Sequence, residues 1–202
     1  MSTFFEPENG MKQNAKTERI LDVALELLET EGEFGLTMRQ VATQADMSLS
    51  NVQYYFKSED LLLVAMADRY FQRCLTTMAE HPPLSAGRDQ HAQLRALLRE
   101  LLGHGLEISE MCRIFREYWA IATRNETVHG YLKSYYRDLA EVMAEKLAPL
   151  ASSEKALAVA VSLVIPYVEG YSVTAIAMPE SIDTISETLT NVVLEQLRIS
   201  NS

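Results

Sequence analysis

Residues 36–62 read LTMRQVATQADMSLSNVQYYFKSEDLL, and this stretch decides how the chain folds. Thr37 followed by Gln40 is the pattern of a capping box and predicts the start of a helix. Ser48 predicts the start of a second, short helix, and Asp46 lies in the break between them. Each helix is too short to be stable alone. We therefore expect a helix, a tight turn and a second helix, packed on other elements.

The second of these helices presents short or amide-bearing side chains, which suit base edges and phosphates. The residues concerned are Ser48, Leu49, Ser50, Asn51, Gln53 and Tyr54. A helix of this size fits the major groove of B-DNA while its partner crosses the backbone. Because any small three-helix domain has polar outer faces, a docking surface for another protein that binds no DNA is the alternative interpretation.

Helical periodicity continues on both sides of this stretch, and strand signals are scarce. A first helix is expected to end at Gly32. Later helices are expected at about 58–81, 89–106, 109–124, 126–147, 154–177 and 182–197. The prediction is an all-α fold of about nine helices, divided into a helix-turn-helix domain (11–57), a connecting helix (58–81) and a C-terminal helical domain (82–202).

Composition excludes several classes of protein. The chain has 202 residues, 48% of them hydrophobic, and a formal net charge of −10, which fits a globular protein rather than a disordered one. Its two cysteines indicate a reduced, cytoplasmic compartment. The histidines share no metal-ligand spacing, and no nucleophile motif or phosphate-binding glycine loop is present. We expect no catalytic residue, metal site or cofactor, and hence no enzyme.

Residues 156–178 are apolar over a length that spans a bilayer. Glu169 lies inside this stretch, where a carboxylate is costly in lipid, and the flanks carry no basic cluster. We therefore expect a helix buried in protein, with no membrane as partner.

Residues 36–48 and 52–62 closely match the pattern of the TetR family of transcriptional regulators, which the chain also resembles in length and helical content. The resemblance implies a homodimer that binds a palindromic operator in double-stranded DNA. It also implies that the C-terminal domain dimerises and binds a small-molecule effector, here unknown, which releases a repressor from its operator.

The resemblance places the DNA contacts on Thr37, Ser48, Leu49, Ser50, Asn51, Gln53, Tyr54 and Lys57. Arg39 is expected to meet a phosphate, with an ion pair to Glu33 as the alternative. Lys12 and Lys16 are expected to form a basic arm that reaches DNA, with a solvated terminus as the alternative. The sequence departs from the family at two positions: Asp46 replaces the usual glycine of the turn, and Glu59 replaces a phosphate-binding lysine.

The C-terminal half mixes aromatic, methionine and charged side chains that are candidates to contact the effector. They are Arg73, Met111, Phe115, Arg116, Trp119, Tyr135, Tyr167, Glu169 and Tyr171. Core packing is the alternative for each aromatic or methionine, and a structural salt bridge is the alternative for Glu169. The dimer interface is expected on the last two helices, through Val161, Val164, Val168, Ile185, Leu189 and Val192.

The acidic total does not oppose DNA binding, because the charges are unevenly distributed. Residues 34–57 carry Arg39 and Lys57 against Asp46, a net charge of +1. The distribution predicts few phosphate contacts and greater reliance on polar readout and dimer geometry.

Overall fold

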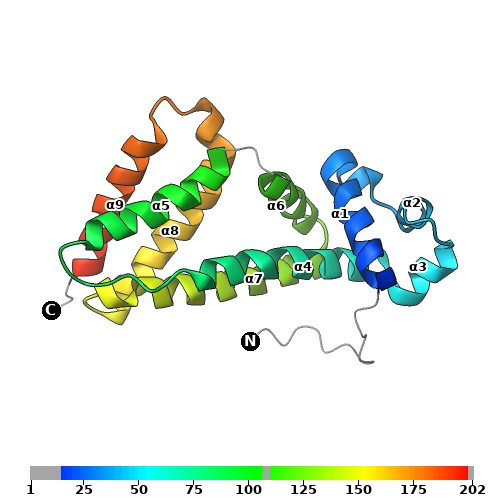
Figure 1. The fold of residues 1–202 in the computed structure, drawn as a ribbon, viewed down its shortest axis with the longest axis horizontal. Coiled ribbons are helices and arrows are strands. Elements are labelled where there is room, and N and C mark those ends of the chain that lie inside the picture. The colour runs from blue at the N-terminus through cyan, green and yellow to red at the C-terminus, as the bar shows by residue number, and fades with distance from the viewer. Residues whose placement is uncertain (1–14, 107–109, 200–202) are drawn as a thin grey trace. The chain divides into compact units, whose positions relative to one another are not determined.

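The structure, a computed structural model, describes residues 15–106 and 110–199, with the backbone alone at 104–106, 110–113 and 176. Every regular element in these ranges is helical (Figure 1). The α-helices are α1 (Ala15–Gly35), α2 (Met38–Gln44), α3 (Leu49–Tyr55), α4 (Glu59–Glu80), α5 (Gln90–Leu106), α6 (Glu110–Ala122), α7 (Glu126–Leu147), α8 (Glu154–Thr174) and α9 (Ile182–Arg198). Short 3₁₀ turns, η1 (Ala148–Leu150) and η2 (Ala175–Ala177), follow α7 and α8. The expected all-α fold is confirmed.

Side-chain caps start several helices where the sequence predicts them. The hydroxyl of Thr37 accepts the N–H of Gln40 at 3.2 Å, and that of Ser48 accepts the N–H of Asn51 at 3.2 Å. Asp46 adopts φ 57, the left-handed conformation expected of the residue at the usual glycine position. The turn between α2 and α3 is therefore built without glycine.

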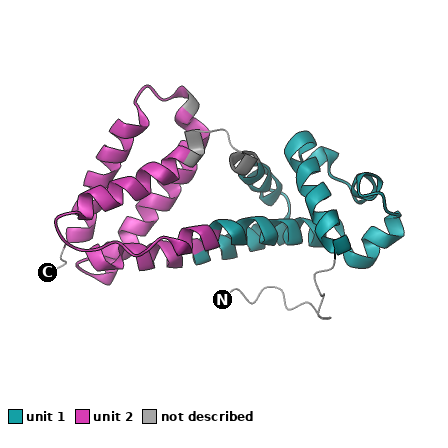
Figure 2. Ribbon diagram, in the orientation of Figure 1, with its two compact units in different colours: residues 1–74, 113–138 teal, residues 75–112, 139–202 magenta. Residues whose placement is uncertain are grey.

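The chain divides into two compact units (Figure 2). Unit 1 comprises residues 1–74 and 113–138, and unit 2 comprises residues 75–112 and 139–202. This differs from the three consecutive segments expected, because the end of α6 and the first half of α7 belong with the helix-turn-helix and not with the later helices. Buried aromatic contacts within unit 1 account for the difference.

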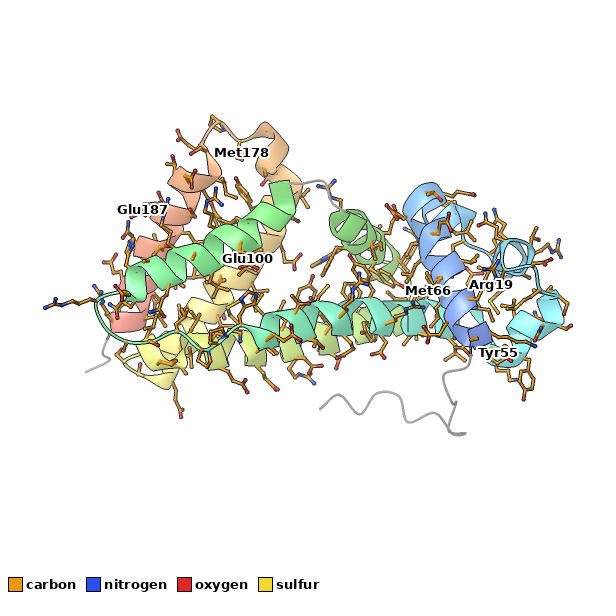
Figure 3. The ribbon with its side chains drawn as sticks, viewed as in Figure 1. Arg19, Tyr55, Met66, Glu100, Met178 and Glu187 are labelled. Atoms are coloured by element: carbon orange, nitrogen blue, oxygen red, sulfur yellow. The ribbon has the colours of Figure 1, made fainter. Side chains whose placement is uncertain are left out.

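The helix-turn-helix rests on α1 within unit 1. Val41, Val52 and Phe56 are buried together with the apolar face of α1. Arg19 of α1, labelled in Figure 3, donates from Nε to the carbonyl of Ala45 at the end of α2, at 3.0 Å. This hydrogen bond satisfies a helix C-terminal carbonyl and fixes the turn that precedes α3.

An aromatic core joins α4, α6 and α7 within unit 1. Phe71 is completely buried, and its ring centroid lies 4.7 Å from those of Phe115 and Tyr135. Tyr118, also completely buried, donates its hydroxyl to the carbonyl of Leu63 at 2.8 Å. Burial raises the pKa of Tyr118 well above its ordinary value, so the hydroxyl remains a donor.

Unit 2 has its own core of leucine, valine and alanine from α5, α8, α9 and the end of α7. An ion-pair cluster joins α5 to α9 at the surface: Arg99 Nε lies 2.8 Å from Asp183 Oδ1, and Arg95 Nε lies 2.8 Å from Glu187 Oε2. The hydrogen bond and charge of Arg99 hold the pKa of Asp183 below its ordinary value. Glu187, labelled in Figure 3, marks this cluster on α9.

Helix α8 is buried on one face only. It is long and apolar enough to cross a membrane by length and composition, with a mean hydropathy of 1.6. Only 28% of its most apolar 18-residue segment is buried in the protein. Its exposed face carries large apolar side chains at helical spacing, namely Val159, Leu163, Tyr167 and Val173. The helix is therefore less buried than the sequence led us to expect.

The side chains expected at a dimer interface divide between buried and exposed positions of α8 and α9. Val161, Val164 and Leu189 are buried in the core of unit 2, and their place at a dimer interface stays a prediction. Val168 and Ile185 are partly buried against that core, and Val192 is exposed. Because α8 is apolar on nearly all sides, its sequence pattern could not distinguish the inward face from the outward one.

A buried lysine holds the end of α4. Lys146 of α7 is 4% exposed, and its ammonium donates to the carbonyl of Ala79 at 3.1 Å and to that of His81. The two acceptors lie at and beyond the last turn of α4, where carbonyls have no partner within the helix. Lys146 therefore caps α4 from a neighbouring helix.

We expect Lys146→Met to lower the free energy of unfolding by about 1–3 kcal/mol, because it preserves volume but removes the donor of two part-buried hydrogen bonds. Urea denaturation measures the change. The matched control is Lys155→Met at an exposed position of α8, which should change stability by less than about 0.5 kcal/mol. Equal stability of the Lys146 variant and the wild type would contradict the assigned role.

Candidate nucleic-acid interface and effector region

The outer face of α3 is polar and carries no charged side chain. Ser48 and Ser50 place their hydroxyls 3.0 Å apart at its N-terminus, and Ser50 and Gln53 are exposed. Asn51 and Leu49 are half-buried. These side chains form one surface on a helix whose opposite side packs through Val52. The arrangement suits hydrogen bonding to base edges in a groove.

Tyr54 and Lys57 extend this surface beyond α3. The ring of Tyr54 is 70% exposed and packs edge-on against Tyr55, with ring centroids 5.2 Å apart. The ammonium of Lys57 lies 5.5 Å from the centroid of the Tyr54 ring, within the range of a cation–π contact. An exposed aromatic with an adjacent cation provides a planar surface and a phosphate partner at the same point.

The remaining candidates for DNA contact differ in how the structure describes them. Arg39 is exposed on α2, and Glu33, its alternative partner, is instead ion-paired with Arg124. Lys16 is exposed in the first turn of α1. Lys12 lies outside the described residues.

The first turn of α4 adds negative charge beside this surface. Glu59 and Asp60 are both exposed there, where they complement the N-terminal dipole of α4. Partial burial, and secondarily the charge of Asp60, raise the pKa of Glu59 above its ordinary value of 4.5. The carboxylates favour the helix but disfavour a nearby phosphate.

Unit 1 brings several of the predicted effector residues together. The ring centroids of Phe115 and Tyr135 lie 6.0 Å apart within the aromatic core. Trp119 is half-exposed, and its indole N–H donates to the hydroxyl of Tyr136 at 3.0 Å. The Arg73 guanidinium lies 5.8 Å from the centroid of the Tyr70 ring. Arg116 is half-buried on α6, and the side chain of Met111 is not described.

The other effector candidates belong to α8 of unit 2. The rings of Tyr167 and Tyr171 stack with centroids 6.3 Å apart, one turn from each other. Glu169 is half-buried, and its carbonyl accepts the hydroxyl of Ser172 at 2.7 Å. The predicted effector residues therefore form two groups, one in each unit.

An acidic group lies beside the aromatic core of unit 1. The hydroxyl of Tyr131 donates to Asp68 Oδ1 at 3.4 Å. Burial raises the pKa of Asp68, although the hydrogen bond from Tyr131 opposes this. Burial and the charge of Asp68 raise the pKa of Tyr131 as well. Sequence reasoning missed this pair, because its members are 63 residues apart and share no motif.

Sequence reasoning also missed three side chains at the junction of α6 and α7. Glu117, Arg124 and Asn125 contact the last turn of α1 and the first turn of α4. No local signal could have identified them, because their partners are 65 to 91 residues away along the chain. In the ranges 15–106 and 110–199, no three His, Cys, Asp or Glu side chains gather as metal ligands do.

The chain is similar in sequence to curated helix-turn-helix regulators. No family model matches the chain. The transcriptional repressor KstR of Rhodococcus jostii is 32% identical over 97 residues, which cover 46% of this chain and 44% of that protein. The regulator BetI of Burkholderia thailandensis is 23% identical over 154 residues, 74% of this chain and 78% of that protein. The match to KstR thus spans less than half of the relative's length, and both relatives are described as helix-turn-helix transcriptional regulators.

Solved structures extend the similarity of fold along the chain. A transcriptional regulator from Rhodococcus sp. Rha1 superposes with a TM-score of 0.73 at 16% identity, over 93% of this chain and all of that chain. A TetR-family member from Streptomyces coelicolor A3 has a TM-score of 0.67 at 21% identity, over 92% of this chain and all of that chain. The fold and the sequence matches define the class of helix-turn-helix proteins. Within that class, the chain shares the fold of a TetR-family structure and is similar in sequence to helix-turn-helix transcriptional regulators.

Proposed function

We propose that this protein is a homodimeric transcriptional repressor that binds a palindromic DNA operator through α3 and is released by a small-molecule effector. The observation that carries the proposal is the uncharged polar face of α3, flanked by exposed Tyr54 and Lys57. The helix-turn-helix regulators that match the chain support it. The compartment we propose is the cytoplasm, where an operator is accessible.

The proposed DNA contacts divide by role. Ser48, Leu49, Ser50, Asn51 and Gln53 read base edges, while Thr37, Arg39, Tyr54, Lys57 and the basic arm of Lys12 and Lys16 contact the backbone. The charge of Glu59 opposes one phosphate contact. The proposal therefore includes weak affinity for non-specific DNA.

Glu59→Lys is expected to strengthen duplex binding, because it removes a repulsion and adds a phosphate contact. The slope of log affinity against log salt should steepen by about one for each subunit. Fluorescence anisotropy at two salt concentrations, on DNA from upstream of the gene that encodes this chain, measures the affinity and the slope. Unchanged affinity and slope would place Glu59 away from the duplex. No binding by either protein would favour a protein-docking module.

Glu59→Gln removes the charge of the carboxylate without adding a cation, and it is the control for the pH dependence of DNA affinity. The raised pKa means that protonation removes the carboxylate charge as pH falls through a value above 4.5. Duplex affinity of the wild type should therefore rise as pH falls toward that pKa, and the Gln variant should respond less. An identical pH response of the two proteins would contradict a carboxylate close to DNA.

The proposed dimer uses the exposed face of α8 and the neighbouring part of α9. Leu163 lies one turn from both Val159 and Tyr167, and Val192 adds an exposed apolar side chain on α9. A contiguous apolar face of this kind is unusual on a soluble monomer. A second copy of the chain covers it in the proposed assembly, which also sets the spacing of the half-sites.

Leu163→Glu is expected to convert the dimer to a monomer, because the proposed interface would then bury a glutamate of one subunit opposite the same glutamate of the other. Light scattering coupled to size exclusion at micromolar concentration gives the mass. Ala86→Glu introduces the same charge at an exposed loop position and should leave the dimer intact. A wild-type monomer, or a dimeric Leu163 variant, would exclude this interface.

The proposed effector is an aromatic cation held beside the aromatic core of unit 1. Phe115, Tyr135 and Trp119 supply ring faces and edges, and Asp68 supplies a carboxylate, a combination that attracts cations. The multidrug-binding protein EbrR shares the fold, and its complexes with malachite green, ethidium and proflavin have been solved. The malachite green complex has a TM-score of 0.68 at 21% identity, over 92% of this chain and all of that chain. Arg73, Arg116, Met111 and the α8 group of Tyr167, Glu169 and Tyr171 are secondary candidates.

Binding of proflavin or ethidium is expected to quench the fluorescence of Trp119, the single tryptophan of the chain, in a saturable manner. Asp68→Asn should weaken the apparent affinity by about 2- to 30-fold, as expected for loss of a cation's charge partner. Glu169→Gln provides the comparison in unit 2. If only the Glu169 variant responds, the effector binds at the α8 group and the unit 1 assignment is wrong.

A further inference from the structure

The junction of α6 and α7, which we call the α6–α7 corner, comprises Glu117, Arg124 and Asn125. All three side chains reach other parts of unit 1. They contact the chain just before α2 and just after α3, which are the two ends of the helix-turn-helix. The corner therefore contacts both ends of the DNA-reading segment without belonging to it.

The first contact fixes the backbone at the end of α1. Oε2 of Glu117 accepts the N–H of Glu33 at 3.2 Å. The preceding residue, Gly32, adopts φ 70, which interrupts the helix and favours glycine. A Cβ at Gly32 would lie 3.4 Å from the same carboxylate oxygen. The carboxylate thus lies closely against the backbone at the point where α1 is interrupted.

The second contact fixes the side chains of the same segment. Arg124 is ion-paired with Glu33, and its guanidinium carbon lies 5.9 Å from the centroid of the Phe34 ring. From the turn after α6, it also donates to the carbonyl of Ala120 on that helix, at 3.3 Å. Residues 33 and 34 are therefore held by the turn after α6, a few residues before Thr37 caps α2.

The third contact fixes the first turn of α4. Asn125 donates from Nδ2 to Asp60 Oδ1 at 2.7 Å, and its Oδ1 accepts the N–H of Val128 at 3.0 Å. One amide thus caps α7 and holds α4. Because Asp60 follows α3 by five residues, the corner also fixes the exit from the helix-turn-helix.

The same helices carry the aromatic core. Phe115 and Tyr118 lie on α6, within three residues of Glu117, and Tyr131 and Tyr135 lie on α7 after Asn125. Packed helices move as rigid bodies rather than deforming continuously. The aromatic core therefore holds in place the two helices whose junction makes the three corner contacts.

We propose that the α6–α7 corner positions the helix-turn-helix for DNA. The proposal rests on the proposed function for its DNA readout. Glu117, Arg124 and Asn125 are positioning residues, since they act on Thr37 and the α3 face through the segments that they hold.

Asn125→Asp is the sharpest test of this role. The substitution keeps an oxygen for the Val128 N–H and therefore the cap of α7, but it places a carboxylate opposite Asp60. Duplex affinity should fall about tenfold, within the range of coupling seen between contacting residues. In an Asp60→Asn background the same substitution should cost little, because donor and acceptor are exchanged and the hydrogen bond is restored.

Two further variants separate positioning from a general loss of stability. Glu117→Gln keeps an acceptor oxygen and should bind DNA within about threefold of wild type, whereas Glu117→Ala should match the Asn125 variant. Thr123→Ala removes a hydroxyl that donates to the carbonyl of Ala120, three residues earlier in the chain, and should leave DNA affinity unchanged. Equal affinity losses for all corner variants, tracking their melting temperatures, would overturn the proposal.

Amide hydrogen exchange provides a readout that does not depend on DNA. Asn125→Asp should accelerate exchange across residues 37–56 and leave α8 and α9 unchanged, and the Asp60→Asn background should restore protection. If the wild type binds no duplex, the proposed function fails, yet this exchange pattern still decides whether the corner holds the helix-turn-helix. Unchanged exchange in residues 37–56 would overturn the proposal even if the protein binds DNA.

Discussion

The burial of Phe71 is the constraint on which unit 1 depends. Its ring is completely buried and lies against Phe115 and Tyr118 of α6 and Tyr131 and Tyr135 of α7, with centroid distances of 4.7 to 6.0 Å. Each such pair contributes about 0.5–1.5 kcal/mol beyond the burial of area. Because Phe71 lies on α4, the helix that follows the helix-turn-helix is packed against both helices that form the corner.

This packing explains why the compact units cut across the order of the chain. The sequence suggests consecutive domains, since Pro82 and Pro83 interrupt the chain clearly. The aromatic side chains of α6 and α7 instead bury themselves against α4, so residues 113–138 join the N-terminal helices. Helix-breaking residues in the sequence mark where a helix ends. The compact unit to which a helix belongs is instead determined by the hydrophobic side chains against which it packs.

Local signals predicted the helices well, because a helix boundary depends on a few adjacent residues. Thr37, Ser48, Ser153 and Ser181 each accept a backbone N–H at the start of a helix, and the left-handed conformation of Asp46 followed from its place in the turn. The α3 surface could be assigned for the same reason. Its residues are consecutive, and Val52 determines which side faces inward.

Features that depend on distant partners were beyond prediction from one sequence. Nothing near Asn125 indicates that its amide meets Asp60, and nothing near Glu33 indicates Arg124 rather than Arg39. The faces of α8 were ambiguous for a different reason. With apolar residues on nearly all sides, helical periodicity loses its information, and Val161 and Leu163 look equivalent until the neighbouring helices bury one and expose the other.

The acidic first turn of α4 is best understood from these same contacts. Asp60 accepts a hydrogen bond from Asn125, so its carboxylate holds the exit of the helix-turn-helix, and Glu59 beside it complements the dipole of α4. A lysine at position 59 would serve a phosphate better and the helix N-terminus worse. The chain thus has its carboxylates where they stabilise the scaffold, and leaves the α3 face uncharged. In the proposed function, this arrangement makes recognition depend more on polar contacts to bases and on the spacing of two subunits than on attraction to the DNA backbone.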